Sequence, residues 1–340
     1  MSLEINPRNE LLKLYRGEDT KTIPTCRYVD VAFAPGERPA LPSIPGSQGL
    51  DWFGVNWECC PDLSWAPTLE KPRLNDVTKW KEEGVVPTAE AIDALDWDAW
   101  AAMWEEKFDR KNHLQEVWIT SGFFERLHNL MGFEDSLCAY YTDPDAVHEF
   151  MDAMLVYKKH LFRKIKEYLN PDAIFQMDDF GHNKNTFLSR EMWKEFIELR
   201  LGKLIDYTHE LGLFYNLHSC GNIMTILADI VALGPDAVNP AQAVNDLVEY
   251  KRIVGNKALI IDELNRQIVD SAYSLDADVE REIRKGVRTL AAGGHYLPQI
   301  FDFGMEGAKD VNATPEEARA KLVIDATAEE LKSLGYELIR

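Results

Sequence analysis

DAIFQMDD at residues 172–179, LFYNLHS at 213–219, DAVN at 236–239 and ALIID at 258–262 are the four stretches that decide the fold. Each has the length and apolar content of a short buried strand, and the almost uninterrupted ALIID is typical of a parallel strand covered on both faces. The segments between them, 189–211, 222–233 and 243–254, carry the periodicity or the start and stop signals of helices. Strands that alternate with helices of about ten or more residues predict crossover units and a parallel sheet.

The same alternation extends in both directions along the chain. The further predicted elements are a first strand near 24–33, a helix at 89–110, a strand at 113–121, helices at 123–131, 143–168 and 276–292, a strand at 295–301 and a helix at 314–334. We therefore expect a (β/α)8 TIM-type barrel, with an open doubly wound sheet as the alternative. Neither GxGxxG nor GxxxxGK[ST] follows a strand, which removes the usual reason to prefer the open sheet.

Residues 33–88 differ from the rest of the chain in composition and periodicity. They are rich in proline, glycine and tryptophan and show no sustained helical period. We expect them to form an irregular N-terminal extension that contributes to the wall of the site. The whole chain, 1–340, is predicted to be one domain.

Composition excludes several classes of protein. The chain has 340 residues, with 37 Lys and Arg against 57 Asp and Glu, so its net charge of −20 argues against general nucleic-acid binding and against adhesion to anionic membranes. No run reaches the roughly 20 apolar residues of a membrane helix, and the start of the chain has no apolar core of a signal peptide. Five cysteines without regular spacing suggest free thiols and a cytoplasmic protein.

Polar residues at the ends of apolar strands are the candidate site, because the active site of a barrel lies at the carboxyl ends of its strands. His218 and Cys220 are two residues apart and share one face of a strand, and both side chains are good zinc donors. Asp178 and Asp179 point to opposite faces, so only one of them can face the barrel axis.

Three further strand-end groups complete the candidates. Asn239 and Gln242 can orient a substrate through hydrogen bonds, whereas Asp262 and Glu263 form an acidic end to ALIID that packing alone does not explain. Each group also has a purely structural alternative: a loop-starting aspartate that binds its own backbone, a core histidine beside a buried thiol, or amides that satisfy the main chain.

The order and spacing of these motifs resemble the uroporphyrinogen decarboxylase superfamily, and within it the corrinoid-dependent methyltransferases. The resemblance rests on segments along nearly the whole chain: Asn9-Glu10-Leu11-Leu12, Tyr15-Arg16-Gly17-Glu18, Ile23-Pro24, Gly49 to Val55, Leu74 to Trp80, Phe124-Glu125-Arg126-Leu127, Met131 to Asp135, Asp178-Asp179, His218 to Asn222 and Gly293-Gly294. The N-terminal segments look most like the O-demethylase methyltransferases, which take methyl groups from methoxylated aromatic compounds.

The resemblance implies a TIM-type barrel and an enzyme of anaerobic one-carbon metabolism that works with a separate corrinoid protein. The decarboxylases of the superfamily carry an RQAGR-like segment that grips tetrapyrrole carboxylates. Here the corresponding stretch contains only Arg27, and Arg266 is the other cation that we name for such a clamp, so decarboxylation is the less favoured reading. Members that act on coenzyme M, methanol or methylamines are a further alternative, and a binding scaffold without turnover is a third. The coenzyme M enzymes supply a zinc-binding Cys near the last strand, whereas this chain has no Cys after Cys220.

We therefore expect transfer of a methyl group from an aryl methyl ether to the cobalt of a partner's corrinoid. The roles are assigned as follows: Asp178, Asp179 and His218 catalytic; Trp52, Trp57, Phe180, Asn239, Gln242 and Asp262 binding the substrate; His218, Cys220, Asp178 and Glu263 holding zinc, with Asp179 as an alternative carboxylate ligand.

Overall fold

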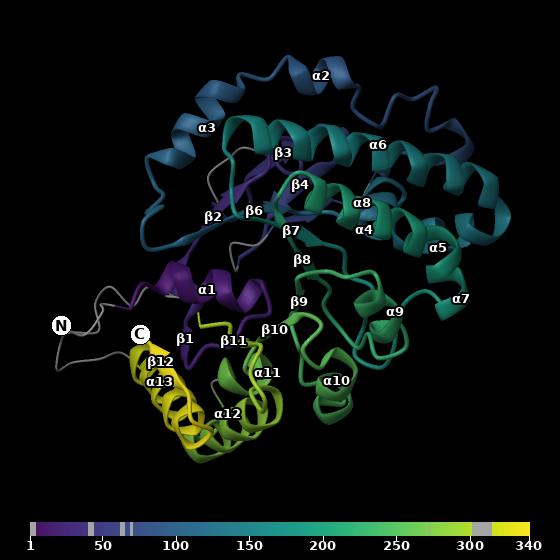
Figure 1. Cartoon of the computed structure of the whole chain (residues 1–340). Helices are drawn as coiled ribbons and strands as arrows, with labels where there is room; N and C mark the ends of the chain where they lie inside the picture. Colours follow the sequence, from purple (N-terminus) through teal and green to yellow (C-terminus); the bar gives the residue numbers. More distant parts are fainter. Residues whose placement is uncertain (1–4, 40–43, 62–64, 69–70, 272, 301–314) are drawn as a thin grey trace.

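Seven parallel strands form one curved sheet in the computed structural model, which describes residues 5–39, 44–61, 65–68, 71–271, 273–300 and 315–340 (Figure 1). They are β2 (Val29–Phe33), β6 (Leu114–Ile119), β7 (Ala173–Met177), β8 (Phe214–His218), β9 (Ala237–Asn239), β10 (Leu259–Asp262) and β11 (Tyr296–Pro298). Their order across the sheet is their order along the chain. The TIM-type fold is thus confirmed, since a doubly wound sheet would reverse its strand order.

The sheet contains seven strands rather than eight, and within the described residues no backbone pairing joins β2 to β11. A 3₁₀ turn, Cys26–Tyr28, precedes β2, and the Cys26 thiol lies 3.6 Å from the Pro298 carbonyl oxygen at the end of β11. This contact brings the two edges near each other without a strand-to-strand ladder.

At least one helix follows each strand of the sheet from β2 to β11. The helices are α1 (Pro7–Tyr15), α2 (Ala89–Asp93), α3 (Trp97–Glu105), α4 (Phe123–Met131), α5 (Phe133–Thr142), α6 (Pro144–Tyr168), α7 (Arg190–Trp193), α8 (Leu199–Glu210), α9 (Leu227–Ala232), α10 (Leu247–Val254), α11 (Arg266–Val269), α12 (Asp276–Leu290) and α13 (Pro315–Ser333). A π-helical turn, Lys194–Glu198, joins α7 to α8.

Most predicted helices are confirmed, and the differences have local causes. The predicted helix 89–110 is interrupted because the Asp96 side chain accepts a hydrogen bond from the backbone N–H of Ala99 and starts α3 anew. The two resulting helices, α2 and α3, arch over α6 (Figure 1). The sequence analysis did not identify α1, α5 or α11. Helix α9 begins at Leu227 rather than near residue 222, because a loop occupies the intervening residues.

The expectation of an irregular segment at 33–88 is wrong in part. This segment contains a three-stranded antiparallel sheet of β3 (Gln48–Leu50), β4 (Asn56–Cys59) and β5 (Trp65–Pro67). A buried ion cluster attaches it to α4: the Arg126 guanidinium lies 2.5 Å from an Asp51 oxygen and 3.1 Å from a Glu37 oxygen. All three side chains are completely buried, so removing one charge would leave the others uncompensated.

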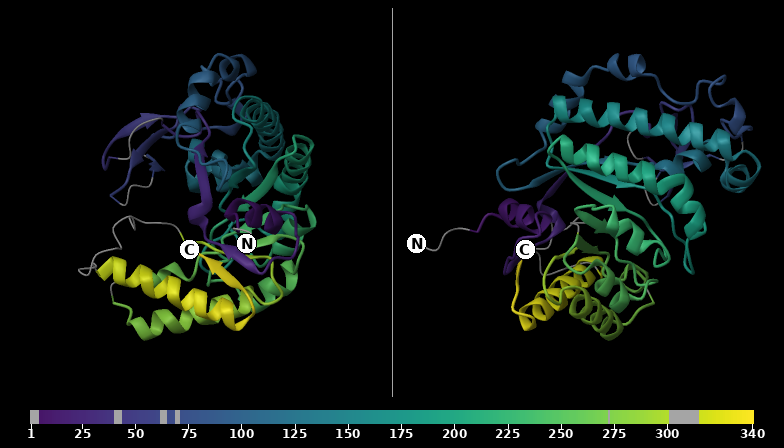
Figure 2. Two further views of the ribbon diagram at one scale, coloured as in Figure 1. Left: turned by 60° about the vertical axis from the view of Figure 1, so that its left-hand side comes forward. Right: turned by 45° about the vertical axis from the view of Figure 1, so that its right-hand side comes forward.

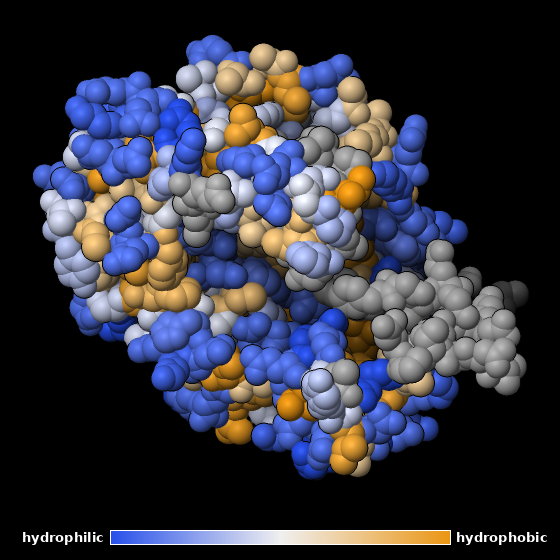
Figure 3. All heavy atoms as spheres, turned by 180° about the vertical axis from the view of Figure 1, so that it is seen from behind, coloured by the Kyte–Doolittle hydropathy of each residue, from blue (hydrophilic) through white to orange (hydrophobic). Residues whose placement is uncertain are grey.

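A strand near the start of the chain pairs with a strand at its C-terminal end. Residues Thr22–Pro24 (β1) pair in parallel with Glu337–Ile339 (β12), directly after α13 (Figure 2). Among the described residues, no helix combines the length and the apolar character that crossing a lipid bilayer requires. The face shown in Figure 3 is hollowed near its centre, and its exposed hydrophobic atoms lie in several separate groups.

Polar contacts identify which side chains point into the barrel. The Tyr15 hydroxyl, at the end of α1, donates to the Glu116 carboxylate of β6 at 2.5 Å, and Asn216 of β8 donates to both groups at 3.1 Å. Because side chains alternate along a strand, Trp118 on β6 and His218 on β8 face the same interior.

Candidate functional site

The candidate site lies where β7, β8 and β9 end. In the sheet register Met177 pairs with His218, and His218 pairs with Asn239, so the residues that follow these strands emerge close together. The alternation that puts His218 inside the barrel also puts Cys220 there. On β7 the same rule selects Asp179, which follows Met177 by two residues, and turns Asp178 to the outer face.

Asp179, His218 and Cys220 form a three-residue group, each offering one ligand atom within 4.8 Å of the other two. The Cys220 sulfur lies 3.4 Å from His218 Nε2, and an Asp179 oxygen lies 3.5 Å from the same nitrogen. That Asp179 oxygen also accepts the Cys220 backbone N–H at 2.8 Å, which holds the two loops in register. His218 and Cys220 thus lie next to a carboxylate, which is that of the alternative ligand Asp179 rather than that of Asp178.

Asn239 fixes the imidazole. Its Oδ1 lies 2.7 Å from His218 Nδ1, so the hydrogen bond places the proton on Nδ1 and leaves the lone pair of Nε2 directed at Cys220 and Asp179. Metal-binding histidines commonly have this arrangement, in which the second ring nitrogen donates to an oriented acceptor.

Gln242 and Glu263 lie next to the Cys220 thiol. The Gln242 amide donates to a Glu263 oxygen at 2.8 Å and lies 3.8 Å from the Cys220 sulfur, while its carbonyl oxygen accepts the Gly221 backbone N–H. Burial, followed by the nearby Asp179 and Glu263, raises the pKa of the Cys220 thiol. Burial also raises the pKa of Glu263. Glu263, which we expected among the metal ligands, lies beside the group of three rather than within it.

Two close glycines bring the loops after β7 and β8 together. The backbone N–H of Gly181 donates to the Cys220 carbonyl at 3.2 Å. A Cβ at Gly221, whose φ is +85°, would lie 2.1 Å from the Gly181 carbonyl carbon. The loop that carries Cys220 therefore has no room for a side chain at this position.

Asp178 does not join the group, contrary to the expectation that it binds metal. Its carboxylate accepts backbone N–H groups of Phe123, Phe124 and Glu125 at 2.8, 3.2 and 2.9 Å, at the start of α4. Burial raises the pKa of Asp178 to about 7, although the three hydrogen bonds act in the opposite direction and lower it. Because its oxygens already serve the orphan donors of a helix start, Asp178 acts as a cap on the outer side of the sheet.

Asp262 is also turned away from the site. One of its oxygens accepts the Tyr296 hydroxyl and the other accepts the Leu264 backbone N–H, both at 2.9 Å. A Cβ at Gly286 of α12 would lie 3.6 Å from it, which places Asp262 between the sheet and that helix. We expected Asp262 to bind substrate, and this expectation is wrong. Side chains alternate along β10, so Ile261 and Glu263 face the interior of the barrel and Asp262 faces outward.

The three aromatic residues predicted as walls of the site lie elsewhere. Trp52 packs against Gly36, where a Cβ would overlap its ring, and the Trp57 indole donates to Asp51 in the buried ion cluster. Phe180 is buried against Phe124 and Trp193 on the outer side. Their aromatic character marked them in the sequence, but in the structure their rings contact other packed groups.

The ring nearest the imidazole is instead Phe175. Its centroid is 5.2 Å from that of His218, and Trp118 stacks on its other side at 4.5 Å. Both occupy interior positions on β7 and β6, which the register of the sheet identifies.

Glu125 is a site residue that the sequence analysis did not single out for chemistry. Burial, then the carboxylates of Asp179 and Asp178, raises its pKa well above the ordinary value. Its Oε2 is buried and has no hydrogen-bond partner in the described structure. Glu125 lies in a helix, so it is not among the polar residues at the ends of strands that the sequence indicated.

The donor chemistry of the group fits zinc. Nitrogen, thiolate sulfur and carboxylate oxygen are the three ligand types of protein zinc sites, and a set of three leaves a coordination position for a substrate. The additional negative charge of Glu263 beside the group favours a bound cation.

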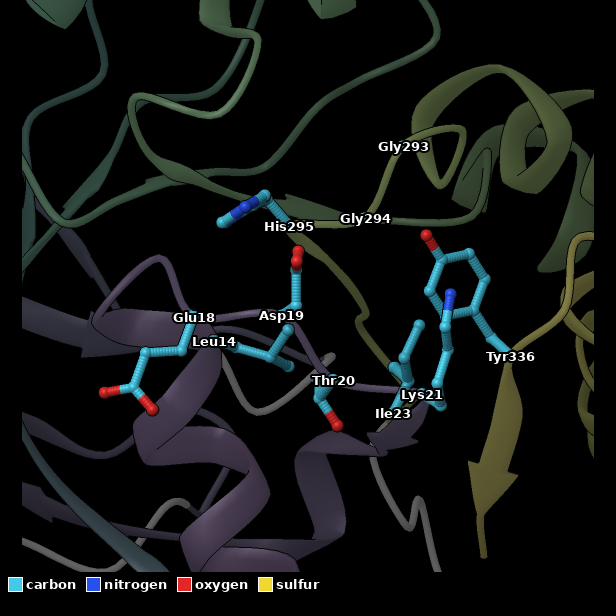
Figure 4. A pocket seen from close by; sticks show the side chains of 10 residues that line it. All are labelled: Leu14, Glu18, Asp19, Thr20, Lys21, Ile23, Gly293, Gly294, His295 and Tyr336. Atoms are coloured by element: carbon cyan, nitrogen blue, oxygen red, sulfur yellow. The ribbon is translucent and has the colours of Figure 1, made fainter.

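A separate cavity of about 230 Å³ lies at the opposite, amino-terminal end of the strands (Figure 4). It is lined by Leu14, Glu18, Asp19, Thr20, Lys21, Ile23, Gly293, Gly294, His295 and Tyr336. Lys251, whose pKa burial lowers to about 8, donates to the Gly294 carbonyl beside it. None of the predicted site residues lines this cavity.

Three comparisons relate the chain to known proteins. The family model described as uroporphyrinogen decarboxylase (URO-D) matches residues 120–304. The methylcobamide:CoM methyltransferase MtaA of Methanosarcina barkeri is 22% identical over 114 residues, which are 33% of this chain and 33% of that protein. The match thus spans about a third of that curated relative. A solved methyltransferase structure from Methanosarcina mazei superimposes with a TM-score of 0.64 at 15% identity, covering 96% of this chain and 99% of that one, a likeness of fold. Because the family model matches more than half of the chain, the protein belongs to the uroporphyrinogen decarboxylase family.

Proposed function

We propose that the protein is a methyltransferase that moves a methyl group between a small methylated compound and the cobalt of a corrinoid held by a separate protein. The group of Asp179, His218 and Cys220, with His218 oriented by Asn239, is the observation that carries the proposal. The relative from Methanosarcina barkeri supports it, since its name describes transfer of a methyl group involving a methylated cobamide.

The three side chains would hold zinc, which when bound supplies Lewis acidity at the atom that gains or loses the methyl group. Residues around the group orient its ligands. Asn239 accepts a hydrogen bond from His218 Nδ1 and so directs Nε2 of the ring at the group, and the Asp179 carboxylate holds the Cys220 backbone at 2.8 Å. Gln242 separates the Glu263 carboxylate from the Cys220 sulfur.

The methyl donor of our proposal is a methoxylated aromatic compound. In its demethylation the methyl group passes to the reduced cobalt of the partner's corrinoid, which supplies the electron pair of the new bond. The methyl–oxygen bond breaks with its electron pair left on oxygen, and the phenolate takes up a proton from solvent. A phenol has a pKa of about 10 and water about 15.7, so a phenolate is a better leaving group than hydroxide by at most about 8 kcal/mol. An aryl ether therefore needs only modest help at oxygen, such as a single Lewis acid or acid group gives.

A thiol acceptor is the second candidate, because the curated relative by its name methylates coenzyme M. A lyase is less favoured. Of the two cations that the sequence offered for a carboxylate clamp, Arg266 forms a 2.6 Å ion pair with Asp270, and Arg27 precedes β2, at the end of the strands opposite to the candidate site.

Metal analysis tests the metal group directly. Purified protein is expected to contain about one zinc per chain, and His218→Ala is expected to lose it. His209→Ala is the matched control, because His209 pairs with Asp236 at the far end of β9 and lies outside the group. A metal-free protein that retains full activity would contradict the zinc assignment.

A methyl-transfer assay tests the activity. The protein is combined with a reduced corrinoid protein and with methoxyarenes, methanol, methylamines or methylthiols in turn, and methylation of cobalt is followed by absorbance together with the demethylated product. Transfer from methoxyarenes alone supports the proposal, and transfer to or from thiols selects the second candidate. Failure with every donor, accompanied by carbon dioxide release from a carboxylated compound, would replace it with a lyase.

A further inference from the structure

Three interior rings form a continuous aromatic wall, which we define as Phe33, Trp118 and Phe175. Phe33 pairs with Trp118 in the register of β2 and β6, and their ring centroids are 5.8 Å apart. Trp118 stacks on Phe175, which in turn contacts the His218 ring. The wall therefore runs from the edge strand β2 to the candidate metal group.

Arg38 lies at the β2 end of this wall. It follows β2 by five residues, and its guanidinium carbon is 3.6 Å from the centroid of the Phe33 ring. Burial lowers its pKa, yet an arginine keeps its charge in proteins. Stacking on a ring satisfies the face of a guanidinium and leaves its edge, with the N–H donors, available for hydrogen bonds.

No hydrogen bond or salt bridge reaches Arg38 from any residue that the structure describes. Its neighbour Glu37 turns the other way and is already paired with Arg126. Arg38 is half-buried, so its N–H donors remain open to a ligand, and in a chain of net charge −20 a lack of carboxylates does not explain why none of the described residues pairs with it.

The charges along the wall are opposite at its two ends. Arg38 stands at one end, whereas Asp179 and Glu263 lie at the other, around His218 and Cys220. An aromatic ligand with one anionic group would be oriented by this difference, because the acidic end repels the anion that Arg38 attracts.

We propose that Arg38 binds the carboxylate of an aromatic substrate whose ring lies against the aromatic wall, with its methoxy group directed at the metal group. The inference rests on the proposed function and narrows its substrate class to methoxylated aromatic carboxylates. Arginine suits this role because its planar donors match both oxygens of a carboxylate.

Equilibrium binding tests the inference without a corrinoid protein. Calorimetry compares para-methoxybenzoate with the neutral para-methoxybenzamide, which has the same shape. The wild-type protein is expected to prefer the benzoate by about 10- to 100-fold, as one charge-assisted contact gives. Arg38→Gln is expected to abolish this preference while it binds the amide unchanged, and Arg38→Lys is expected to retain part of it. Arg190→Gln is the control, because Arg190 pairs with Asp229 on the surface.

The outcomes separate the inference from the function. Equal binding of the two ligands by the wild type, or a preference that survives Arg38→Gln in a protein with an unchanged circular dichroism spectrum, overturns the role of Arg38. If methyl transfer from methoxyarenes is nevertheless observed, the proposed function stands and only the carboxylate-binding role of Arg38 is wrong. Conversely, a preference that depends on Arg38 supports the carboxylate site even if every transfer assay fails.

Discussion

The side-chain oxygen of Asn239 lies 2.7 Å from Nδ1 of His218, so the residue that ends β9 decides which nitrogen of the β8 histidine can bind a metal. The two residues are paired in the sheet register. The orientation of the imidazole is consequently a property of the sheet and does not depend on a loop.

Replacing Asn239 by leucine is expected to weaken zinc binding by about 10- to 100-fold, the usual cost of losing the acceptor behind a metal-bound histidine. Asn239→Asp keeps an oxygen in place and is expected to retain the affinity. Competition with a chromophoric chelator measures both variants. Equal affinities of the leucine variant and the wild type would show that Asn239 does not orient the ligand.

Asp178 and Asp179 are adjacent in sequence but are expected to respond differently to mutation. Asp178→Ala leaves three buried N–H groups of α4 without an acceptor and should lower the free energy of unfolding of the metal-free protein by about 2 kcal/mol or more. Asp179→Ala should instead lower the zinc content. Urea unfolding in a chelating buffer and metal analysis measure the two effects, and the reverse pattern would contradict the assignment of the carboxylates.

Gly221→Ala is expected to be far more damaging than Gly234→Ala. Both glycines have positive φ, +85° and +78°, so both substitutions incur the backbone cost of about 1 kcal/mol. Only at Gly221 does the new Cβ meet backbone, 2.1 Å from Gly181, whereas nothing lies within 4 Å at Gly234. We expect an additional loss of about 1–3 kcal/mol in the free energy of unfolding together with weaker zinc binding. Equal losses in the two variants would show that the loops can separate without cost.

Asp262 should make stability depend on pH between about pH 4 and pH 6. Burial raises its pKa to about 6, so near pH 5 the folded protein holds a proton that the unfolded chain has released. Its contribution is therefore present below about pH 4 and is lost as the pH rises through about 6.

Asp262→Asn removes this titration and can still accept one of the two hydrogen bonds. Relative to the wild type, its free energy of unfolding is expected to increase by about 2–3 kcal/mol between about pH 4 and pH 7. Urea titrations at several pH values measure the difference. A difference that does not change with pH would show that Asp262 keeps its ordinary pKa in the folded protein.

The alternation of strands and helices was predictable because each element leaves a local pattern. The strand 172–179 contains β7, and the helices 123–131 and 143–168 match α4 and α6 within one residue. The antiparallel sheet at β3–β5 left no such pattern. Its strands have three or four residues, and they are held by contacts with distant groups such as Arg126 rather than by their own periodicity.

Within the site, spacing alone paired His218 with Cys220, since two residues on one strand that are two apart must share a face. The choice between Asp178 and Asp179 required coordinates, because parity shows that the two diverge but not which one points inward. No chemical role was assigned to Glu125 or Arg38 from the sequence, since one lies in the first turn of a helix and the other follows a strand by five residues.

The sequence by itself determined the succession of parallel strands and the residues that stand at their carboxyl ends, because hydrophobic periodicity and chain order are local properties. Only the tertiary structure decided which of those residues meet. That outcome depends on strand register, on the direction in which each side chain leaves the sheet, and on close backbone contacts such as Gly181 with Gly221, all of which arise between segments far apart in the chain.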